Sequence, residues 1–261
     1  MFERALAAVA ASLSLPLVWT SGCGLTGPVA SLASEDTYIF FLICVIFVSF
    51  VILVFQNMRK LGVGGNWCFV DVLGLEPEQL GAVPKPCCAL MLLFPLTQQH
   101  ESFRAQQADK VSTDSDVYFL KQTVVNSCGT IALVHAVANN QSKLSFETDS
   151  VLKAFLDETA NMSAADRAKH LENNKAICAA HNDVAMEGQC RPEADEVNFH
   201  FIAFVNVNGQ LYEFDGKING PVNHGATSED SFVADAAKVC RGFIEREQDE
   251  LRFSAVAFCQ C

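Results

Sequence analysis

Basic residues are scarce in this sequence. It contains 18 Lys and Arg residues against 30 Asp and Glu residues, which gives a formal net charge of -12 at pH 7. Nucleic-acid binding depends on Lys and Arg contacts to phosphates, so this charge excludes nucleic acid as the main partner. A basic protein or peptide is the partner that the charge favours.

Cysteine motifs are also missing, although cysteine itself is abundant. The chain has 11 cysteines, but none stands in a C-x-x-C pair or near histidines at the spacing of a zinc site. We therefore expect no metal and no cofactor. Neighbouring Cys87 and Cys88 are not expected to bond to each other. We interpret most of the thiols as small buried hydrophobic residues of a protein in a reducing compartment.

Charge of either sign is nearly absent from the start of the chain. This pattern predicts two unequal parts, a hydrophobic N-terminal segment over residues 1–57 and one globular domain over residues 58–261. The second part is long enough for a single large domain, and the 50% hydrophobic content of the chain supports a substantial core.

The N-terminal part contains an uncharged apolar run from Tyr38 to Phe55. A helix of roughly 17 to 25 such residues can cross a bilayer. Acidic residues precede the run and Arg59 and Lys60 follow it, so insertion would leave the rest of the chain in the cytoplasm. One interpretation is therefore a signal or transmembrane helix over residues 38–55 with membrane association. The other is a segment that does not insert.

Helix and strand patterns alternate irregularly beyond residue 58. Buried strands are indicated by "CALMLLFPL" and by "LRFSAVAFC" near the end of the chain. The stretch "VNFHFIAFVNVNGQLYEFDG" predicts a hairpin that turns at Asn208 and Gly209. Amphipathic helices are predicted for "SVLKAFLDETANMS", "SAADRAKHLENNKAI" and "DSFVADAAKVCRGFIERE". Because the order lacks the regular alternation of a doubly wound fold, the predicted class is α+β with an antiparallel sheet.

Cys128 is the candidate nucleophile. Asn126 and Ser127 are good N-cap residues, which places Cys128 in the first turn of the following helix. The unpaired N–H groups and the positive end of the helix dipole favour a thiolate there. Position alone is more typical of a structural cysteine, so catalysis also requires a base.

His200 is the candidate base because its neighbours follow from the hairpin register. A turn at Asn208 and Gly209 makes His200 a diagonal neighbour of Asp215, roughly 7 to 8 Å away at the backbone and within side-chain reach. A carboxylate bonded to one ring nitrogen fixes the tautomer and raises the basicity of the other. The alternative is a structural His–Asp pair that joins two strands.

The hairpin is expected to bury one face and to present His200 on the other. The predicted core face carries Phe199, Phe201, Ala203, Val205, Tyr212 and Phe214, and the His200 face carries Asn198, Ile202, Phe204 and Glu213.

Five further histidines have no identifiable catalytic partner. His135 lies about 10 Å along the helix from Cys128 and is interpreted as a packed helix residue. A solvated surface position is expected for the others, which are His100, His170, His181 and His224.

Gln122 completes the set of candidate catalytic residues. It precedes Cys128 closely enough for its side-chain amide to join the Cys128 backbone N–H in stabilising an oxyanion. A lone glutamine would carry no meaning, since glutamine is common on surfaces. Its value comes from the combination with the other three residues.

These motifs together resemble the ubiquitin carboxyl-terminal hydrolases. The similarity rests on "YFLKQTVVNSCGTIALVHAVANN", "VNFHFIAFVNVNGQLYEFDG" and "PVNHGATSED", and it runs in order from Leu61 to Phe258. It implies a papain-like cysteine hydrolase with an antiparallel sheet flanked by helices and a knotted backbone. The family's catalytic positions correspond to Gln122, Cys128, His200 and Asp215.

The resemblance also implies the reaction and the partner. The expected activity is thiol-dependent hydrolysis of small amide, ester or peptide adducts at the C-terminal glycine of ubiquitin. The alternative is a ubiquitin-binding protein with little or no turnover, since the segment before residue 58 does not resemble the start of the family. Ubiquitin is expected to contact Glu250, Leu251, Arg252, Phe253, Ser254 and Ala255, and a loop over roughly residues 182–196 is expected to cross the active site.

Overall fold

The structure is a computed structural model that describes residues 56, 58–107, 110–114, 116–187, 199–247, 250 and 252–261. All of these residues belong to one compact unit, Ile46–Cys261. The candidate membrane segment from Tyr38 to Phe55 lies outside the described residues. Within the described part of the chain, no helix is both long enough and apolar enough to cross a membrane.

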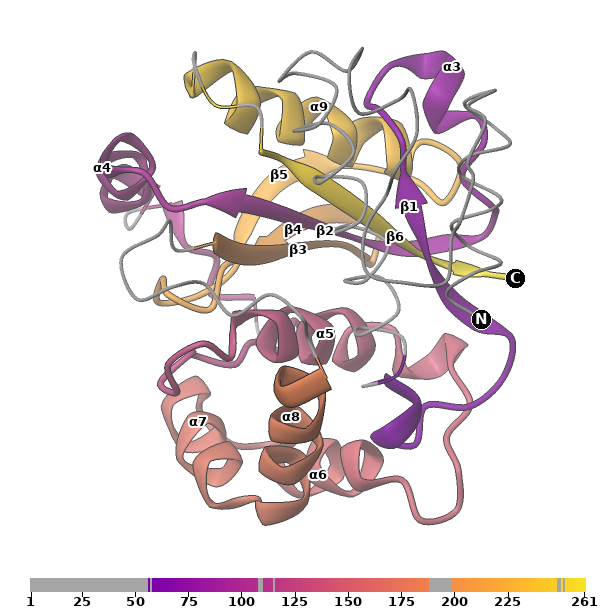
Figure 1. The fold of residues 1–261 in the computed structure, drawn as a ribbon, viewed down its shortest axis with the longest axis vertical. Helices are drawn as coiled ribbons and strands as arrows, with labels where there is room; N and C mark the ends of the chain where they lie inside the picture. The colour runs from indigo at the N-terminus through magenta and orange to yellow at the C-terminus, as the bar shows by residue number, and fades with distance from the viewer. Residues whose placement is uncertain are drawn as a thin grey trace, which may run out of the picture. The chain divides into compact units, whose positions relative to one another are not determined.

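A six-stranded antiparallel sheet forms the centre of the domain (Figure 1). Its order is β1-β6-β2-β3-β4-β5, so the last strand of the chain lies between the first two. The strands are β1 (Trp67–Val72), β2 (Cys87–Pro95), β3 (Phe199–Val207), β4 (Gln210–Phe214), β5 (Val222–Ala226) and β6 (Ser254–Gln260). The predicted α+β class with an antiparallel sheet is confirmed, whereas the backbone knot stays a prediction.

Helices cover both faces of the sheet (Figure 1). On one face α5 packs against β3, with α6, α7 and α8 beyond it, and on the other face α9 packs against β2. The helices are α3 (Pro77–Leu80), α4 (Gln98–Gln107), α5 (Cys128–Ala138), α6 (Val151–Thr159), α7 (Ala164–Asn173), α8 (Lys175–Glu187) and α9 (Phe232–Arg246), with a 3-10 turn at Gln141–Lys143. The α5 helix therefore lies between the sheet and the helices α6, α7 and α8.

The β3–β4 hairpin has the predicted register. Pairing runs from Val207↔Gln210 to Ala203↔Phe214 around a turn at Asn208 and Gly209. Both turn residues have positive φ, 51° and 77°, as the tight hairpin turn requires. The diagonal relation of residues 200 and 215 follows from this register.

The prediction of one buried and one open hairpin face was wrong. Ile202 and Phe204 lie on the His200 face and are completely buried, because α9 places Phe232 and Phe243 against it. Phe199, which was expected in the core, is 43% exposed at the start of β3. A sheet with helices on both faces buries the side chains of both faces. The alternation of residues along the hairpin does not show that a helix also covers the second face.

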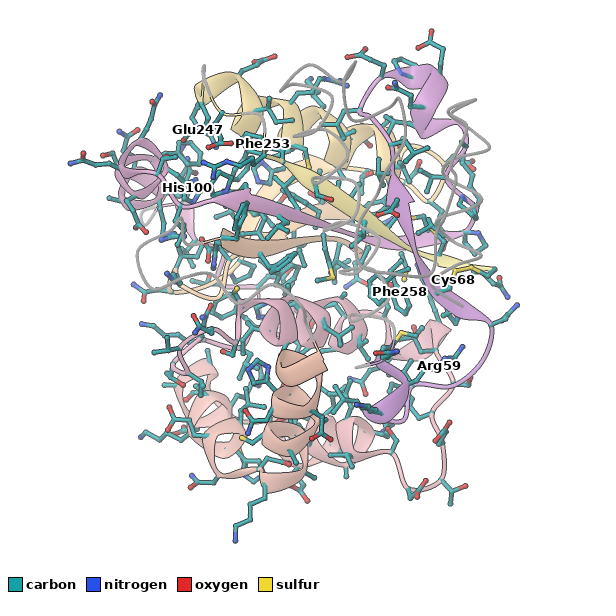
Figure 2. All side chains as sticks on the ribbon, viewed as in Figure 1. Arg59, Cys68, His100, Glu247, Phe253 and Phe258 are labelled. Atoms are coloured by element: carbon teal, nitrogen blue, oxygen red, sulfur yellow. A yellow bond between two sulfur atoms is a disulfide. The ribbon has the colours of Figure 1, made fainter. Side chains whose placement is uncertain are left out.

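Among the described residues, four free cysteines are buried as predicted, while Cys128 and Cys178 are half-buried and one pair of cysteines is bonded. Free thiols at Cys87, Cys88, Cys240 and Cys259 are buried. A disulfide joins Cys68 in β1 to Cys261 at the chain end (Figure 2). The two cysteines are 193 residues apart and form no sequence motif, so the pair could not be foreseen.

The predicted loop over residues 182–196 is partly helical. The helix predicted for "SAADRAKHLENNKAI" breaks at Asn174, and a second helix, α8, runs from Lys175 to Glu187 and includes Asn182 and Asp183. Residues 188–198 lie outside the described residues.

Candidate active site

Cys128 is the first residue of α5, as predicted. Ser127 occupies the N-cap position, but its side chain does not cap the helix, because its hydroxyl donates to the Val124 carbonyl at 2.8 Å. Asn126 has a φ of 61°, a left-handed conformation that asparagine tolerates better than most residues. This sharp turn brings the chain into α5 with the Cys128 thiol at its end.

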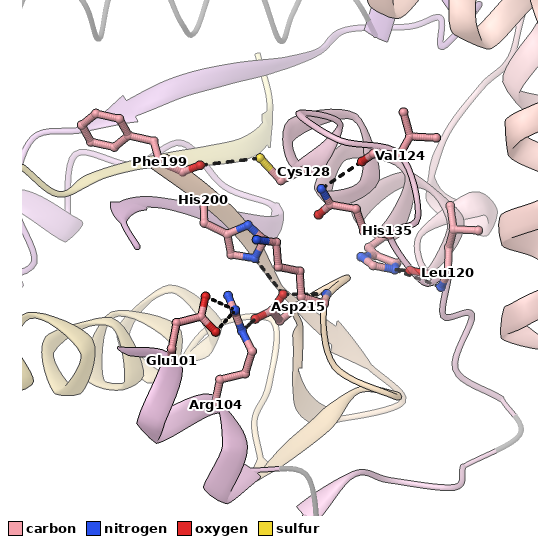
Figure 3. Close-up of polar contacts among 11 residues, drawn as sticks. Glu101, Arg104, Leu120, Val124, Cys128, His135, Phe199, His200 and Asp215 are labelled. Carbon is pink, nitrogen blue, oxygen red and sulfur yellow. Dashed lines mark hydrogen bonds and ion pairs between the residues drawn. The ribbon is translucent and has the colours of Figure 1, made fainter. Parts of the chain in front are cut away.

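His200 and Asp215 form the predicted pair (Figure 3). His200 Nε2 lies 2.7 Å from Asp215 Oδ1, and the side chains are only 1% and 3% exposed. Lys217 N–H donates to the same carboxylate oxygen at 2.9 Å. With Nε2 bound to Asp215, Nδ1 is the ring nitrogen that remains for the thiol.

The thiol of Cys128 is close to His200 and to the backbone of β3. Its Sγ contacts the Phe199 carbonyl at 4.0 Å. Burial acts to raise the pKa of the Cys128 thiol, but the hydrogen bond and charge of His200, with backbone groups of Phe201 and Gly129, outweigh it and lower that pKa below its usual value. The thiolate form is thus favoured.

Complementary shifts act on the other two groups. Burial acts to lower the pKa of His200, but bonding to Asp215 and Cys128 raises it overall. Burial acts to raise the pKa of the Asp215 carboxyl, but His200, Arg104 and the Lys217 backbone hold it far below its usual range. The Asp215 carboxyl is therefore ionised, and the opposite shifts of Cys128 and His200 make transfer of the thiol proton to the imidazole easier than between the free side chains.

Gln122 is held against the loop that follows Asp215. Its N–H donates to the Gly216 carbonyl at 2.7 Å. A Cβ on Gly216 would lie 2.8 Å from Ile131 and 2.9 Å from the Gln122 Cβ, so only glycine allows this approach. The Gln122 amide donates to Val124 O at 3.2 Å, and its buried Oε1 has no partner among the described residues.

These residues meet at an open cleft of about 260 Å³. The turn before α5 forms one wall, and the start of β3 with the loop after β4 forms the other. Its lining consists of Leu96, Gln122, Thr123, Val124, Val125, Asn126, Cys128, Phe199, His200 and Lys217. Asp215 lies behind His200, away from this lining.

The remaining histidines are more engaged than the sequence indicated. His135 is fully buried as predicted, with Nε2 3.0 Å from both N and O of Leu120. His170 and His224 contact carboxylates at 2.8 and 2.7 Å, and His181 contacts Thr130. These partners are distant in sequence, so the pattern could not identify them.

The expected surface position of His100 was wrong. His100 is 3% exposed and packs its ring 4.5 Å from Phe94 and 5.7 Å from Phe243, between centroids. Burial and the charge of Arg104 lower the pKa of His100 to about 3. The polar residues around it in the sequence concealed this position, because α4 turns His100 inward (Figure 2).

Arg104 contacts the site although the sequence did not predict it. Its Nε donates to Asp215 Oδ2 at 2.8 Å from a position 111 residues earlier in the chain. The spacing of Glu101 and Arg104 on one helix face was the only available signal, and it indicates a local ion pair rather than a contact with the site.

The segment expected to contact ubiquitin lies beside the cleft. Arg252 bonds Glu250 at 2.6 and 2.8 Å, and its guanidinium lies 5.8 Å from the Phe199 ring centroid. Phe253 stacks at 6.4 Å on Phe94, while Ser254 and Ala255 begin β6. Leu251 lies outside the described residues.

The described side chains offer no metal site. No group of three or more His, Cys, Asp or Glu residues in this part of the chain could hold a metal ion.

A cysteine that begins a helix and faces a His–Asp pair on an antiparallel sheet defines the papain-like cysteine hydrolases. Within this class, the chain belongs to one family. The family model described as "Ubiquitin carboxyl-terminal hydrolase, family 1" matches residues 53–245.

Individual relatives agree with this assignment. The chain is 64% identical over 206 residues to ubiquitin carboxyl-terminal hydrolase isozyme L1 of Rattus norvegicus and of Homo sapiens, which covers 78% of this chain and 92% of each relative. The isozyme of Monodelphis domestica is 60% identical over 207 residues.

A solved structure supports the fold independently. The catalytic domain of Trichinella spiralis UCH37, bound to ubiquitin vinyl methyl ester, superposes with a TM-score of 0.63 at 24% identity. The match covers 81% of this chain and 93% of that domain.

Proposed function

We propose that the chain is a thiol-dependent deubiquitinase that hydrolyses small amide, ester or peptide adducts at the C-terminal glycine of ubiquitin. The observation that carries this proposal is the Cys128 thiol at the open cleft, with the buried His200–Asp215 pair next to it. Family membership supports the substrate, and so does the solved relative that binds ubiquitin vinyl methyl ester.

In the proposed reaction Cys128 is the nucleophile. The Cys128 thiol gives its proton to Nδ1 of His200, and the resulting thiolate attacks the glycine carbonyl. His200 then gives this proton to the leaving amine or alcohol as the C–N or C–O bond breaks. Asp215 keeps the Nε2 proton of His200 bonded and the ring oriented. Water then attacks the thioester, with His200 accepting its proton and returning one to the sulfur.

Gln122 and the Cys128 backbone N–H are proposed to stabilise the oxyanion. The Gln122 amide donates to Val124 in the free chain, so it must turn away from that carbonyl when substrate enters. Turning is local, because the Gln122 backbone is anchored to Gly216.

Ubiquitin is proposed to bind along the segment from Glu250 to Ala255, including Leu251. Arg252 and Phe253 support this assignment, since they contact Phe199 and Phe94, which lie beside Cys128 and His200. The acidic balance of the chain suits the basic tail of ubiquitin. A cleft of about 260 Å³ suits an extended peptide tail better than a folded protein.

The first prediction concerns covalent capture. A ubiquitin probe with a C-terminal electrophile is expected to label the full chain, and Cys128→Ala is expected to abolish labelling, because only the cleft thiol is activated by His200. Mass spectrometry of the adduct measures this. The matched control is Cys178→Ala, which removes another half-buried thiol from α8 and should leave labelling intact.

The same experiment distinguishes the alternative function. A folded chain that binds ubiquitin but gives no adduct and no hydrolysis would be a binding protein with little turnover. Labelling that persists in Cys128→Ala would contradict the assignment of the nucleophile.

The catalytic domain is proposed to begin near residue 58. Met58 and Leu61 support this boundary, since both are completely buried in the core beneath the sheet.

For location we propose a catalytic domain in the cytoplasm with membrane attachment through Tyr38 to Phe55. This proposal rests on the apolar run and on the basic residues that follow it. The second prediction is that the full chain stays in the membrane pellet after alkaline carbonate extraction, whereas a chain starting at residue 58 is released. Release of the full chain would contradict a spanning helix.

A further inference from the structure

The second carboxylate oxygen of Asp215 is held by an arginine from a different element. Asp215 Oδ1 accepts from His200 and from Lys217 N–H, at 2.7 and 2.9 Å. Asp215 Oδ2 accepts from Arg104 Nε at 2.8 Å (Figure 3). A carboxylate held at both oxygens cannot rotate about its Cβ–Cγ bond without breaking at least one charge-assisted bond.

Arg104 is itself fixed by Glu101, one turn earlier in α4. Arg104 Nη1 lies 2.8 Å from both carboxylate oxygens of Glu101. The side chains of Glu101, Arg104 and Asp215 are 51%, 10% and 3% exposed. A chain of ion pairs thus leads from the surface of α4 to the buried ring of His200.

Asp215 is the buried partner of the Arg104 guanidinium. Among the described residues, the hydrogen bonds of its guanidinium go to Glu101 and Asp215, and its buried Nη2 has no partner. Neighbouring His100 is buried and carries no charge at neutral pH, so it does not compete for the carboxylate. Neither Arg104 nor Asp215 lines the cleft as the described residues form it.

We propose that Arg104 is a positioning residue of the active site, which fixes Asp215 and through it the His200 ring that exchanges protons with Cys128. The proposal rests on the proposed hydrolase function. Loss of Arg104 would free one oxygen of Asp215, so the carboxylate could turn and His200 would leave its productive orientation more often. Because Arg104 does not line the cleft, its loss is expected to lower kcat and to leave KM nearly unchanged.

A merely structural role makes a different prediction. If Arg104 only tied α4 to the sheet, its loss would lower stability but leave the kcat of folded molecules unchanged. It would also act independently of Asp215, and the effects of the two substitutions on kcat would then add.

The third prediction is tested by steady-state hydrolysis of a fluorogenic C-terminal ubiquitin amide, with a double-mutant cycle. We expect Arg104→Gln to lower kcat by about 10- to 100-fold, the scale of misplaced catalytic groups, with KM within about twofold. Arg104→Lys should recover part of the loss, because it keeps a cation but not the rigid fork. The Asp215→Asn/Arg104→Gln double variant should be no slower than Asp215→Asn alone.

Two further variants serve as a second test of the proposal and as a control. Glu101→Gln removes the outer, half-exposed partner and should lower kcat in the same direction but by less, which covers the case that Arg104→Gln does not fold. Arg241→Gln is the matched control, since the hydrogen bond that Arg241 in α9 makes within the described part of the chain goes to the Leu75 carbonyl. It should leave kcat unchanged.

An unchanged kcat in both Arg104→Gln and Glu101→Gln, or additive effects in the cycle, would overturn the positioning role. Labelling of the unaltered chain by the ubiquitin probe tests the hydrolase function separately. Cys128-dependent labelling with an unchanged Arg104→Gln kcat would therefore remove this inference and leave the proposed function standing.

Discussion

At the scale of single residues, Gly216 connects two members of the candidate catalytic set. It follows Asp215 directly, and its carbonyl accepts the N–H of Gln122 at 2.7 Å. A Cβ at this position would lie 2.8 Å from the Ile131 methyl and 2.9 Å from the Gln122 Cβ, closer than real contacts allow. Any larger residue must therefore move Gln122, Asp215 or the first turns of α5.

The fourth prediction follows from this close approach. We expect Gly216→Ala to destabilise the domain by about 1 to 3 kcal/mol, as overpacking does, and to lower kcat for ubiquitin substrates. Chemical denaturation and steady-state kinetics measure the two effects. Gly64→Ala is the matched control, because its Cβ would find its nearest neighbour at 3.6 Å and both quantities should stay near those of the unaltered chain. Unaltered kinetics in Gly216→Ala would show that the close approach does not position the site.

At the scale of elements, local sequence patterns predicted the features that depend on a single turn or a single helix. The Asn208–Gly209 turn determines the register of β3 and β4, and the register brings His200 to Asp215. Cys128 was placed correctly because helix start signals are local, even though Ser127 does not cap with its side chain. Each of these features depends on residues a few positions apart.

Contacts between distant elements could not be predicted in the same way. Arg104 reaches Asp215 because α4 packs beside the end of the sheet, and nothing near residue 104 in the sequence encodes that packing. The buried state of His100 has the same origin. The His200 face of the hairpin is buried because α9 packs on it. The sequence of α9 does not indicate which face of the sheet the helix will cover. Family resemblance supplied the fold, but not these side-chain contacts.

At the scale of the whole molecule, the site lies where the two halves of the core meet. The helix α5 belongs to the core on one face of the sheet, while α9 closes the core on the other face. Cys128 begins α5, the helix that packs on one face of the sheet. His200 lies on the opposite face of β3, the face that α9 covers. The relative placement of thiol and imidazole is therefore determined by how α5 and the sheet pack together, and conditions that loosen either core will affect the site.

Acid is expected to loosen both cores through buried histidines. His100 lies on the inner side of α4 and packs against Phe243 of α9. His135 lies within α5, and burial lowers the pKa of each histidine to about 3. In the unfolded chain both have a pKa near 6.5. Between pH 6.5 and 3 the unfolded chain therefore binds protons that the folded chain does not, and the free energy of unfolding falls as the pH falls.

The fifth prediction isolates His100. His100→Phe keeps an aromatic ring beside Phe94 and Phe243 and removes the titrating group, whose Nε2 has no partner among the described residues. We expect urea unfolding at pH 7 and pH 5 to show a loss of stability that is smaller in His100→Phe than in the unaltered chain by about 2 kcal/mol. Groups that titrate elsewhere, His135 included, cancel in this comparison. Equal losses of stability in the two chains would mean that His100 takes up its proton in the folded state. The core that α9 closes would then not be the source of the acid sensitivity.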